Sequence, residues 1–238
     1  MVALLALLGG VVVLALSLRL TTRLDRIPGA FDGLTDRPAP APGETILMIG
    51  TRPGGGADVP WLGDEQSLES AMLLEIGVDR MRVRVESLPL GGVGAAAASS
   101  PPSTSVAVVE EWSGRRVDHL MVVDWQLFAE LASDNGVDPT YGYGSSASVQ
   151  HAYLRRVMEG TLHAELRKQP LNLYRALSTT ASGTAIDDDW SVLELDRLLV
   201  SLRNLRSQHL EFSMALPGQR SPILAKGSFR GPSGELGY

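Results

Sequence analysis

The chain has 238 residues, of which 44% are hydrophobic, and this length suffices for one sizeable domain with a short additional segment. Its formal net charge is −6 and its isoelectric point is about 5.2, a balance that argues against a general nucleic-acid binder, because affinity for phosphate backbones needs clustered Lys and Arg. It contains no cysteine, which excludes disulfide bonds and thiolate metal sites.

The first residues form an uncharged apolar run. Residues 2–18 carry no charge and are close to the minimum of about 17 residues for a helix that spans a bilayer, so we predict a membrane anchor over residues 1–20. A signal peptide and a buried hydrophobic helix are the alternatives. Arg19, Arg23 and Arg26 follow the run, and the positive-inside rule alone would therefore place the rest of the chain in the cytoplasm.

A proline-rich segment follows the apolar run. Residues 21–44 include four prolines among small and charged residues, which predicts a stiff, extended juxtamembrane spacer. Residues 45–49 are expected to form the first buried strand. The glycine-rich turn 50–56 comes next, and it lacks both the Walker pattern and the spacing of a dinucleotide fingerprint. A plain flexible loop is the favoured interpretation, and a backbone cradle for phosphate is the alternative.

Two strands and a connection are predicted after this turn. Residues 67–76 are nearly continuously apolar, as in a buried strand, and an Asp-Arg pair at 79–80 indicates the turn that follows it. Residues 81–85 alternate between apolar and basic side chains, as a half-exposed strand does. Residues 91–105 are rich in Ala, Ser and Pro, a composition that predicts a flexible surface connection.

The clearest structural signals lie between residues 106 and 137. Apolar residues at helical spacing precede Gly114, where a left-handed residue would end the helix. Residues 119–123 are typical of a buried strand, and Asp124 can cap a second helix whose apolar face includes Trp125. Helix, strand and helix in succession predict a three-layer α/β/α domain over residues 45–218. Its core is expected to contain Ile46, Leu47, Leu73, Leu74, Leu120, Val122 and Phe128.

The next segments contain candidate ligand-binding side chains. Residues 134–148 are rich in Gly, Ser, Asp and Tyr and are predicted to be a loop, in which Tyr141 and Tyr143 either stack on a sugar or cover the edge of the core. Residues 149–166 predict an amphipathic helix. Its Arg155 and Arg156 are candidates for binding an anionic ligand, with a solvated helix face as the alternative.

The C-terminal part offers little sign of a metal site. Three carboxylates at 187–189 precede a helix predicted at 192–202, where negative charge favours the helix dipole; a metal site is the other interpretation. The four histidines show no ligand spacing, and no nucleophile elbow is present. Residues 219–238 are rich in Gly, Pro and Ser and are predicted to be a flexible tail.

Five segments together resemble a known family. They read ETILMIGT, SLESAMLLEIGVDRMRVRVESLPL, WSGRRVDHLMVVDWQLFAELASDNGV, VQHAYLRRVMEG and FSMALPG. In them the chain is similar to LytR-CpsA-Psr (LCP) proteins of the actinobacterial type. The resemblance implies a mixed central sheet and a single-pass, membrane-anchored enzyme that transfers glycopolymers from polyprenyl-pyrophosphate carriers to peptidoglycan. It also implies that the domain is extracytoplasmic, contrary to the charge rule.

The chain departs from this family at the residues that carry the chemistry. The family's metal-binding acids and pyrophosphate-binding arginines are replaced at Arg52, Ser67, Leu90, Gly91 and Ala152. Glu69 is the remaining candidate ligand for Mg²⁺, and a lone carboxylate should hold that ion only weakly. Because phosphoryl transfer needs positioned cations, the resemblance implies a role in glycopolymer attachment with impaired catalysis. Non-catalytic binding of a polyprenyl lipid, or scaffolding, is the alternative.

Overall fold

The computed structural model describes residues 24–54, 59, 61, 66–134, 136–161, 184–202, 205 and 207–218. The predicted anchor over 1–20 and the predicted tail over 219–238 lie outside these ranges, as do residues 55 and 56 of the glycine-rich turn and residues 162–166 of the predicted amphipathic helix. Among the helices in the described ranges, none combines the length and the apolar character needed to cross a membrane.

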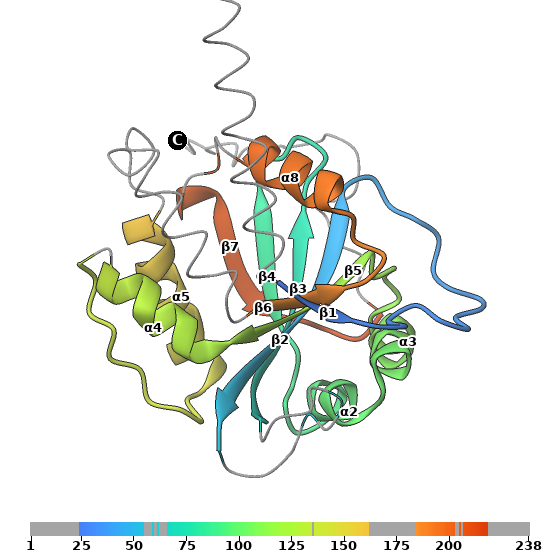
Figure 1. Cartoon of the computed structure of the whole chain (residues 1–238), viewed down its shortest axis with the longest axis horizontal. Helices are drawn as coiled ribbons and strands as arrows, with labels where there is room; N and C mark the ends of the chain where they lie inside the picture. Colours follow the sequence, from blue (N-terminus) through green and yellow to red (C-terminus); the bar gives the residue numbers. More distant parts are fainter. Residues whose placement is uncertain are drawn as a thin grey trace, which may run out of the picture.

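A mixed sheet forms the middle of the domain. The strands are β1 (Asp25–Ile27), β2 (Glu44–Pro53), β3 (Gln66–Ile76), β4 (Val83–Ser87), β5 (His119–Asp124), β6 (Thr184–Asp187) and β7 (Leu210–Met214). Their spatial order is β1-β6-β5-β2-β3-β4-β7 (Figure 1). The pairs β1–β6, β2–β5 and β4–β7 are parallel, whereas β2–β3, β3–β4 and β5–β6 are antiparallel. The mixed sheet that the family resemblance implies is confirmed.

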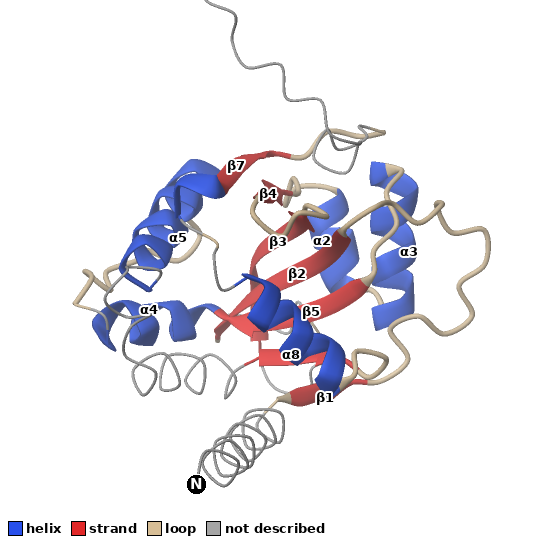
Figure 2. Cartoon of the chain, turned by 90° about the horizontal axis from the view of Figure 1, so that it is seen from above, coloured by secondary structure: helices blue, strands red, loops and turns tan. Residues whose placement is uncertain are grey.

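Helices cover both faces of this sheet. One face carries α2 (Val93–Ser99) and α3 (Pro102–Ser113), and the other carries α4 (Trp125–Asp134) and α5 (Ala147–Thr161), as Figure 2 shows. The helix α8 (Val192–Ser201) packs with α4 and α5 in one apolar cluster through Leu198. A short 3-10 helix, η3 (Ser207–His209), precedes β7. Two separate apolar clusters, one on each face of the sheet, make this the predicted three-layer α/β/α arrangement.

The central strand β2 shows why the apolar runs become strands. Residues 46–49 are all buried, because their side chains alternate between the two helix-covered faces of the sheet. Of the seven residues predicted for the core, five are fully buried, and the other two, Leu74 and Phe128, are partly buried and pack against one of the clusters.

The local signals for helix ends and turns are confirmed. Gly114 follows α3 with φ +68° and ψ +17°, the left-handed conformation expected of a helix C-cap. The Asp124 carboxylate accepts a hydrogen bond from the Gln126 N–H at 2.9 Å and thereby caps α4. Arg80 has φ +57° in the turn between β3 and β4.

Two segments predicted to lie outside the ordered elements belong to the domain. Residues 91–105 were expected to be a flexible connection, but they form α2 and the beginning of α3, because the alanine run favours a helix and buries Ala97 and Ala98. The predicted spacer 21–44 contributes β1, and Ile27 and Ala30 are buried there. The domain therefore begins before residue 45, its predicted start.

The first carboxylate of the acidic run before α8 is not a helix-start charge. Asp187 is fully buried at the end of β6, where its Oδ2 accepts the Leu120 N–H at 3.0 Å. The start of α8 is instead capped by Ser191 and Glu194: the Glu194 carboxylate accepts the Ser191 N–H at 3.0 Å, and Ser191 Oγ accepts the Glu194 N–H at 3.3 Å. This reciprocal pair is a capping box, which satisfies the first amides of the helix.

Gly50→Ala should destabilise the domain by about 1–3 kcal/mol, because a methyl group there would overpack the core. An added Cβ would lie 2.2 Å from Ser70 Oγ and 2.8 Å from Trp125 Cε3. Urea denaturation would measure the loss. Gly91→Ala is the matched control, since an added Cβ meets nothing within 4 Å, and it should stay within about 0.5 kcal/mol of the parent. Equal stability of the two variants would contradict this packing.

Candidate functional site

A β-bulge near the end of β2 and the start of β3 places the candidate metal ligand. Gly50 pairs with Ser70, but the next residue, Thr51, pairs with Leu68, so Glu69 is left out of the ladder. An extra residue in one strand bends that strand and changes the direction of its side chain. The bulge thus sets Glu69 apart from the regular alternation of β3.

Protein donors surround the Glu69 carboxylate. The side chain is fully buried, and the Gly144 N–H lies 3.0 Å from each of its oxygens. The Tyr141 hydroxyl donates to Oε1, and Gln150 Nε2 lies 3.5 Å from the same atom while donating to the Glu69 carbonyl at 2.9 Å. Arg52 Nη1 lies 3.4 Å from Oε2. Glu69 therefore holds the loop between α4 and α5 against the end of the sheet.

The protonation of Tyr141 fits this arrangement. Burial and, next, the hydrogen bond to the Glu69 carboxylate raise the pKa of the Tyr141 hydroxyl far above its ordinary value. The phenol therefore keeps its proton and acts as a donor. Its ring packs between Trp125 and Tyr153, at centroid distances of 5.3 and 4.8 Å, which favours the interpretation that it covers the core edge.

The described residues do not fit a Mg²⁺ site of the kind that the family resemblance implies. Mg²⁺ takes about six oxygen ligands in near-octahedral geometry. Within the described ranges, no group of three or more His, Asp or Glu residues could hold a metal ion. Arg52 also places a guanidinium beside the one candidate carboxylate, where a second cation would be repelled. Arg52 and Glu69 thus form an ion pair at the place where the resemblance implies a metal.

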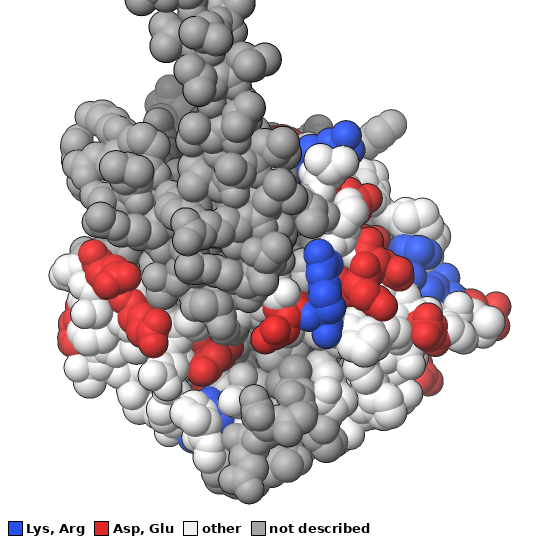
Figure 3. All heavy atoms as spheres, in the orientation of Figure 1, with Lys and Arg blue, Asp and Glu red and all other residues white. Residues whose placement is uncertain are grey.

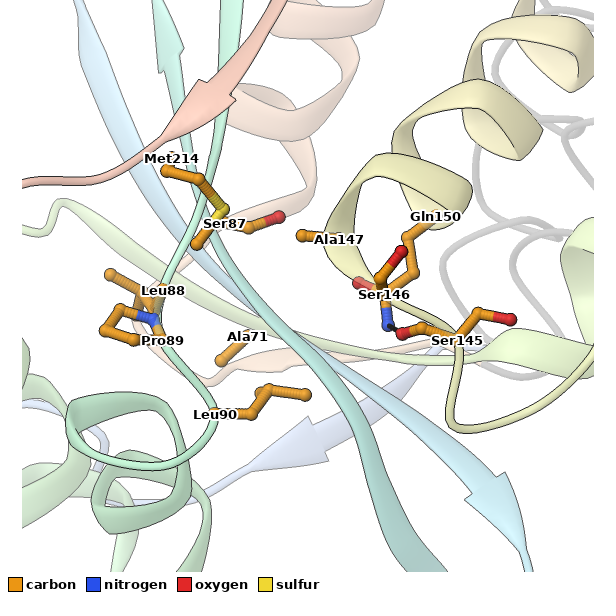
Figure 4. A pocket seen from close by; sticks show the side chains of 10 residues that line it. All are labelled: Ala71, Ser87, Leu88, Pro89, Leu90, Ser145, Ser146, Ala147, Gln150 and Met214. Carbon is orange, nitrogen blue, oxygen red and sulfur yellow. Dashed lines mark hydrogen bonds between the residues drawn. The ribbon is translucent and has the colours of Figure 1, made fainter.

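A cavity of about 240 Å³ lies beside this cluster, between the end of β4 and the start of α5 (Figure 4). Ala71, Leu88, Leu90 and Met214 give it an apolar wall. Ser87, Ser145, Ser146 and Gln150 supply polar groups. Because Gln150 also donates to Glu69, it connects the cavity with the buried carboxylate.

The two predicted ligand-binding arginines lie elsewhere on α5. Both are exposed, and neither lines the cavity. The Arg155 guanidinium carbon lies 5.3 Å from the Phe212 ring centroid, and that of Arg156 lies 5.8 Å from the Tyr153 ring centroid. On the face shown in Figure 3, acidic and basic side chains of the described residues are interspersed and form no broad basic surface.

Sequence reasoning missed one close polar pair at the cavity. Ser87 Oγ lies 2.7 Å from His151 Nε2. The two residues are 64 positions apart, and neither belongs to a motif with a recognisable spacing. Only the packing of α5 against the end of β4 brings them together.

Comparison with solved structures identifies the fold. No family model matches the sequence, and no curated protein matches it significantly. Among solved structures, a LytR-Csp2A-Psr enzyme from Actinomyces oris superposes with a TM-score of 0.55 at 15% identity, covering 80% of this chain and 86% of that one. Protein gbs0355 from Streptococcus agalactiae superposes with a TM-score of 0.52 at 15% identity, covering 72% and 76%. The order of layers and these superpositions show that the chain has the fold of the LytR-CpsA-Psr family.

Proposed function

We propose that this chain is a membrane-anchored protein of the cell envelope, which binds a polyprenyl-linked glycopolymer or its lipid carrier near peptidoglycan. In this proposal residues 1–20 anchor the chain, and the domain lies on the extracytoplasmic side. We further propose that it does not transfer the glycan by the metal and arginine chemistry that the resemblance implies. The fold likeness to an enzyme of this family and the five similar segments support the general assignment.

The Arg52–Glu69 pair is the observation that carries the proposed loss of transfer. Phosphoryl transfer requires cations that neutralise the charge on the transferring group. The Arg52 guanidinium lies 3.4 Å from Glu69, a carboxylate that also accepts hydrogen bonds from the loop. Leu90, where the resembled family has an arginine, contributes instead to the apolar wall of the cavity. The positive charge of Arg52 is thus balanced by the Glu69 carboxylate of the same chain, and not by a bound pyrophosphate.

Lipid binding depends on different properties. An apolar wall takes up a prenyl chain through side-chain volume and the removal of apolar surface from water, so the loss of arginines does not abolish it. The cavity beside β4 has such a wall, and its volume of about 240 Å³ admits only a few carbons at one end of a prenyl chain. Leu90 and Met214 are partly exposed at it and extend the apolar surface outside the cavity. This supports a protein that retains a lipid carrier without turning it over.

A reconstituted assay tests this proposal. The full chain, in detergent micelles, is incubated with a polyprenyl-pyrophosphate-linked glycan, Mg²⁺ and peptidoglycan, beside the LytR-Csp2A-Psr enzyme from Actinomyces oris as the positive control. We expect the lipid to be retained by this chain, with no glycan joined to peptidoglycan and no response to Mg²⁺. Turnover comparable to that of the control would contradict the proposed loss of transfer and would favour an enzyme that transfers the glycan with a rearranged site.

The membrane attachment of the chain and the side on which its domain lies are tested separately. Alkaline extraction should leave the chain in the membrane fraction, and protease added to spheroplasts should digest the domain. Protection from protease would mean that the charge rule, with its three arginines after the apolar run, predicts the orientation correctly.

A further inference from the structure

The Ser87–His151 pair has the geometry of a nucleophile and its base. Ser87 is the last residue of β4 and is buried, and its Oγ lies 2.7 Å from Nε2 of His151, which is within hydrogen-bonding distance. A serine is activated when a neighbouring imidazole can take its proton, and this distance is the first criterion for such a pair. The proposed lipid binding uses neither group as a reactant.

The fold also gives this pair access to the cavity. Gln150 and His151 follow Ala147 by three and four residues on α5, so both lie on the face of the helix that carries Ala147. Ala147 and Gln150 line the cavity, as Ser87 does. In Figure 4 the Ser87 hydroxyl points toward Ala147 across the space between β4 and α5. Ser87 therefore contacts both its base and the cavity.

The environment of His151 keeps its ring neutral. Burial and, to a smaller extent, the nearby Arg155 guanidinium lower the pKa of His151 below its ordinary value. At neutral pH the imidazole can therefore accept the Ser87 proton at Nε2. The ring also packs against Phe212 at a centroid distance of 5.2 Å, which restricts its orientation. We assign the chemistry to these two residues alone, as a dyad.

We propose that Ser87 and His151 hydrolyse a short-chain acyl ester held in this cavity. The apolar wall formed by Leu88, Leu90 and Met214 suits an acyl chain. The volume of about 240 Å³ is below the roughly 300–1,000 Å³ of sites for drug-sized ligands, which limits the chain to a few carbons. Leu90 and Met214 are 37% and 47% exposed, and they leave the cavity open to an entering substrate.

The reaction follows from the positions of these groups. Ser87 Oγ attacks the carbonyl carbon and forms a C–O bond while its proton passes to His151 Nε2. The carbonyl oxygen becomes negative, and we assign its stabilisation to the first amides of α5, whose residue Ala147 lines the cavity. The bond to the leaving alcohol then breaks, and the alcohol takes the proton from His151. A water molecule, deprotonated by His151, attacks the acyl-serine, releases the carboxylic acid and restores Ser87.

Covalent labelling tests the nucleophile directly. The full chain, in detergent micelles, is treated with a fluorophosphonate, a reagent that phosphonylates activated serines, and the adduct is located by peptide mass spectrometry. We expect one adduct, on Ser87. Hydrolysis of p-nitrophenyl acetate and butyrate is measured in parallel, and both Ser87→Ala and His151→Gln should lower the rate by about 100-fold or more, since a general base contributes about 10²–10⁴-fold.

Controls separate this chemistry from misfolding and from background reaction. Ser99→Ala removes an exposed serine of α2 and should leave labelling and hydrolysis unchanged. Circular dichroism and thermal melting show whether each variant is folded. An unlabelled wild-type chain, an adduct on another serine, or ester hydrolysis that persists in Ser87→Ala would overturn the proposal. The readout needs no glycan or prenyl carrier, so this failure would be distinguishable from a failure of the proposed lipid binding.

Discussion

Arg115→Ala is expected to lower the free energy of unfolding by about 3–5 kcal/mol, because it removes the guanidinium shared by two buried carboxylates. Arg115 Nη1 lies 3.0 Å from Glu75 Oε1 and also donates to Glu86 Oε2. The three side chains are 4%, 0% and 2% exposed, respectively, so the substitution leaves two carboxylates buried without this cation. The effect should exceed that of any surface substitution in this domain.

The next residue provides a matched control. Arg116 is 33% exposed, and its Nε lies 3.7 Å from Asp118 Oδ1. Exposed ion pairs contribute about 0–1 kcal/mol, so Arg116→Ala should remain within that range. Chemical denaturation of both variants under the same conditions gives the comparison. If Arg115→Ala is no more destabilising than Arg116→Ala, the buried network contributes little to stability.

Glu69→Ala should destabilise the domain by about 2–4 kcal/mol and release the loop between α4 and α5. The substitution leaves the Gly144 N–H and the Tyr141 hydroxyl without their acceptor, and it leaves Arg52 without its counter-charge. Chemical denaturation measures the decrease in the free energy of unfolding of the whole domain. Hydrogen exchange measures local opening of the loop, and the Gly144 amide should exchange faster than it does in the parent.

A more exposed ion pair, between the first residue of β2 and the turn after β3, separates the effect of burial from that of charge. Glu44 and Arg80 form an ion pair at 2.5 Å, but their side chains are 25% and 28% exposed. Glu44→Ala should therefore cost only about 0–1 kcal/mol and leave Gly144 exchange unchanged. Glu69→Gln, which keeps one acceptor oxygen, should fall between Glu69→Ala and the parent. Unchanged exchange at Gly144 in Glu69→Ala would show that something other than this carboxylate holds the loop.

Features set by neighbouring residues could be predicted from the sequence. The helix end at Gly114 and the cap at Asp124 each depend on one residue and its local backbone, and both are confirmed. The same holds for the apolar runs that become β3 and β5. The composition of residues 91–105 was misleading, because the helix propensity of their alanines and burial against β3 outweigh the serines and prolines around them.

The details of the candidate site depend on contacts between distant segments. Pairing of β3 with β2 creates the bulge at Glu69, and a loop more than 70 residues later supplies its donors. The Ser87–His151 pair likewise forms only when α5 packs against β4. A contact between distant segments leaves no pattern within either segment. For this reason the sequence indicates Glu69 as a free ligand, and it does not indicate the Ser87–His151 pair.

The strand order has a consequence for how the domain forms. β1 pairs with β6, where Asp25 lies opposite Ala185, and β7 pairs with β4, where Leu210 lies opposite Val83. Both edges of the sheet are therefore closed by contacts between residues more than 100 positions apart. Such nonlocal pairings carry a high entropic cost of loop closure, so the domain should fold slowly for its size. Until β7 is in place, β4 has an unpaired edge that can pair with another chain, and aggregation therefore competes with folding during that interval.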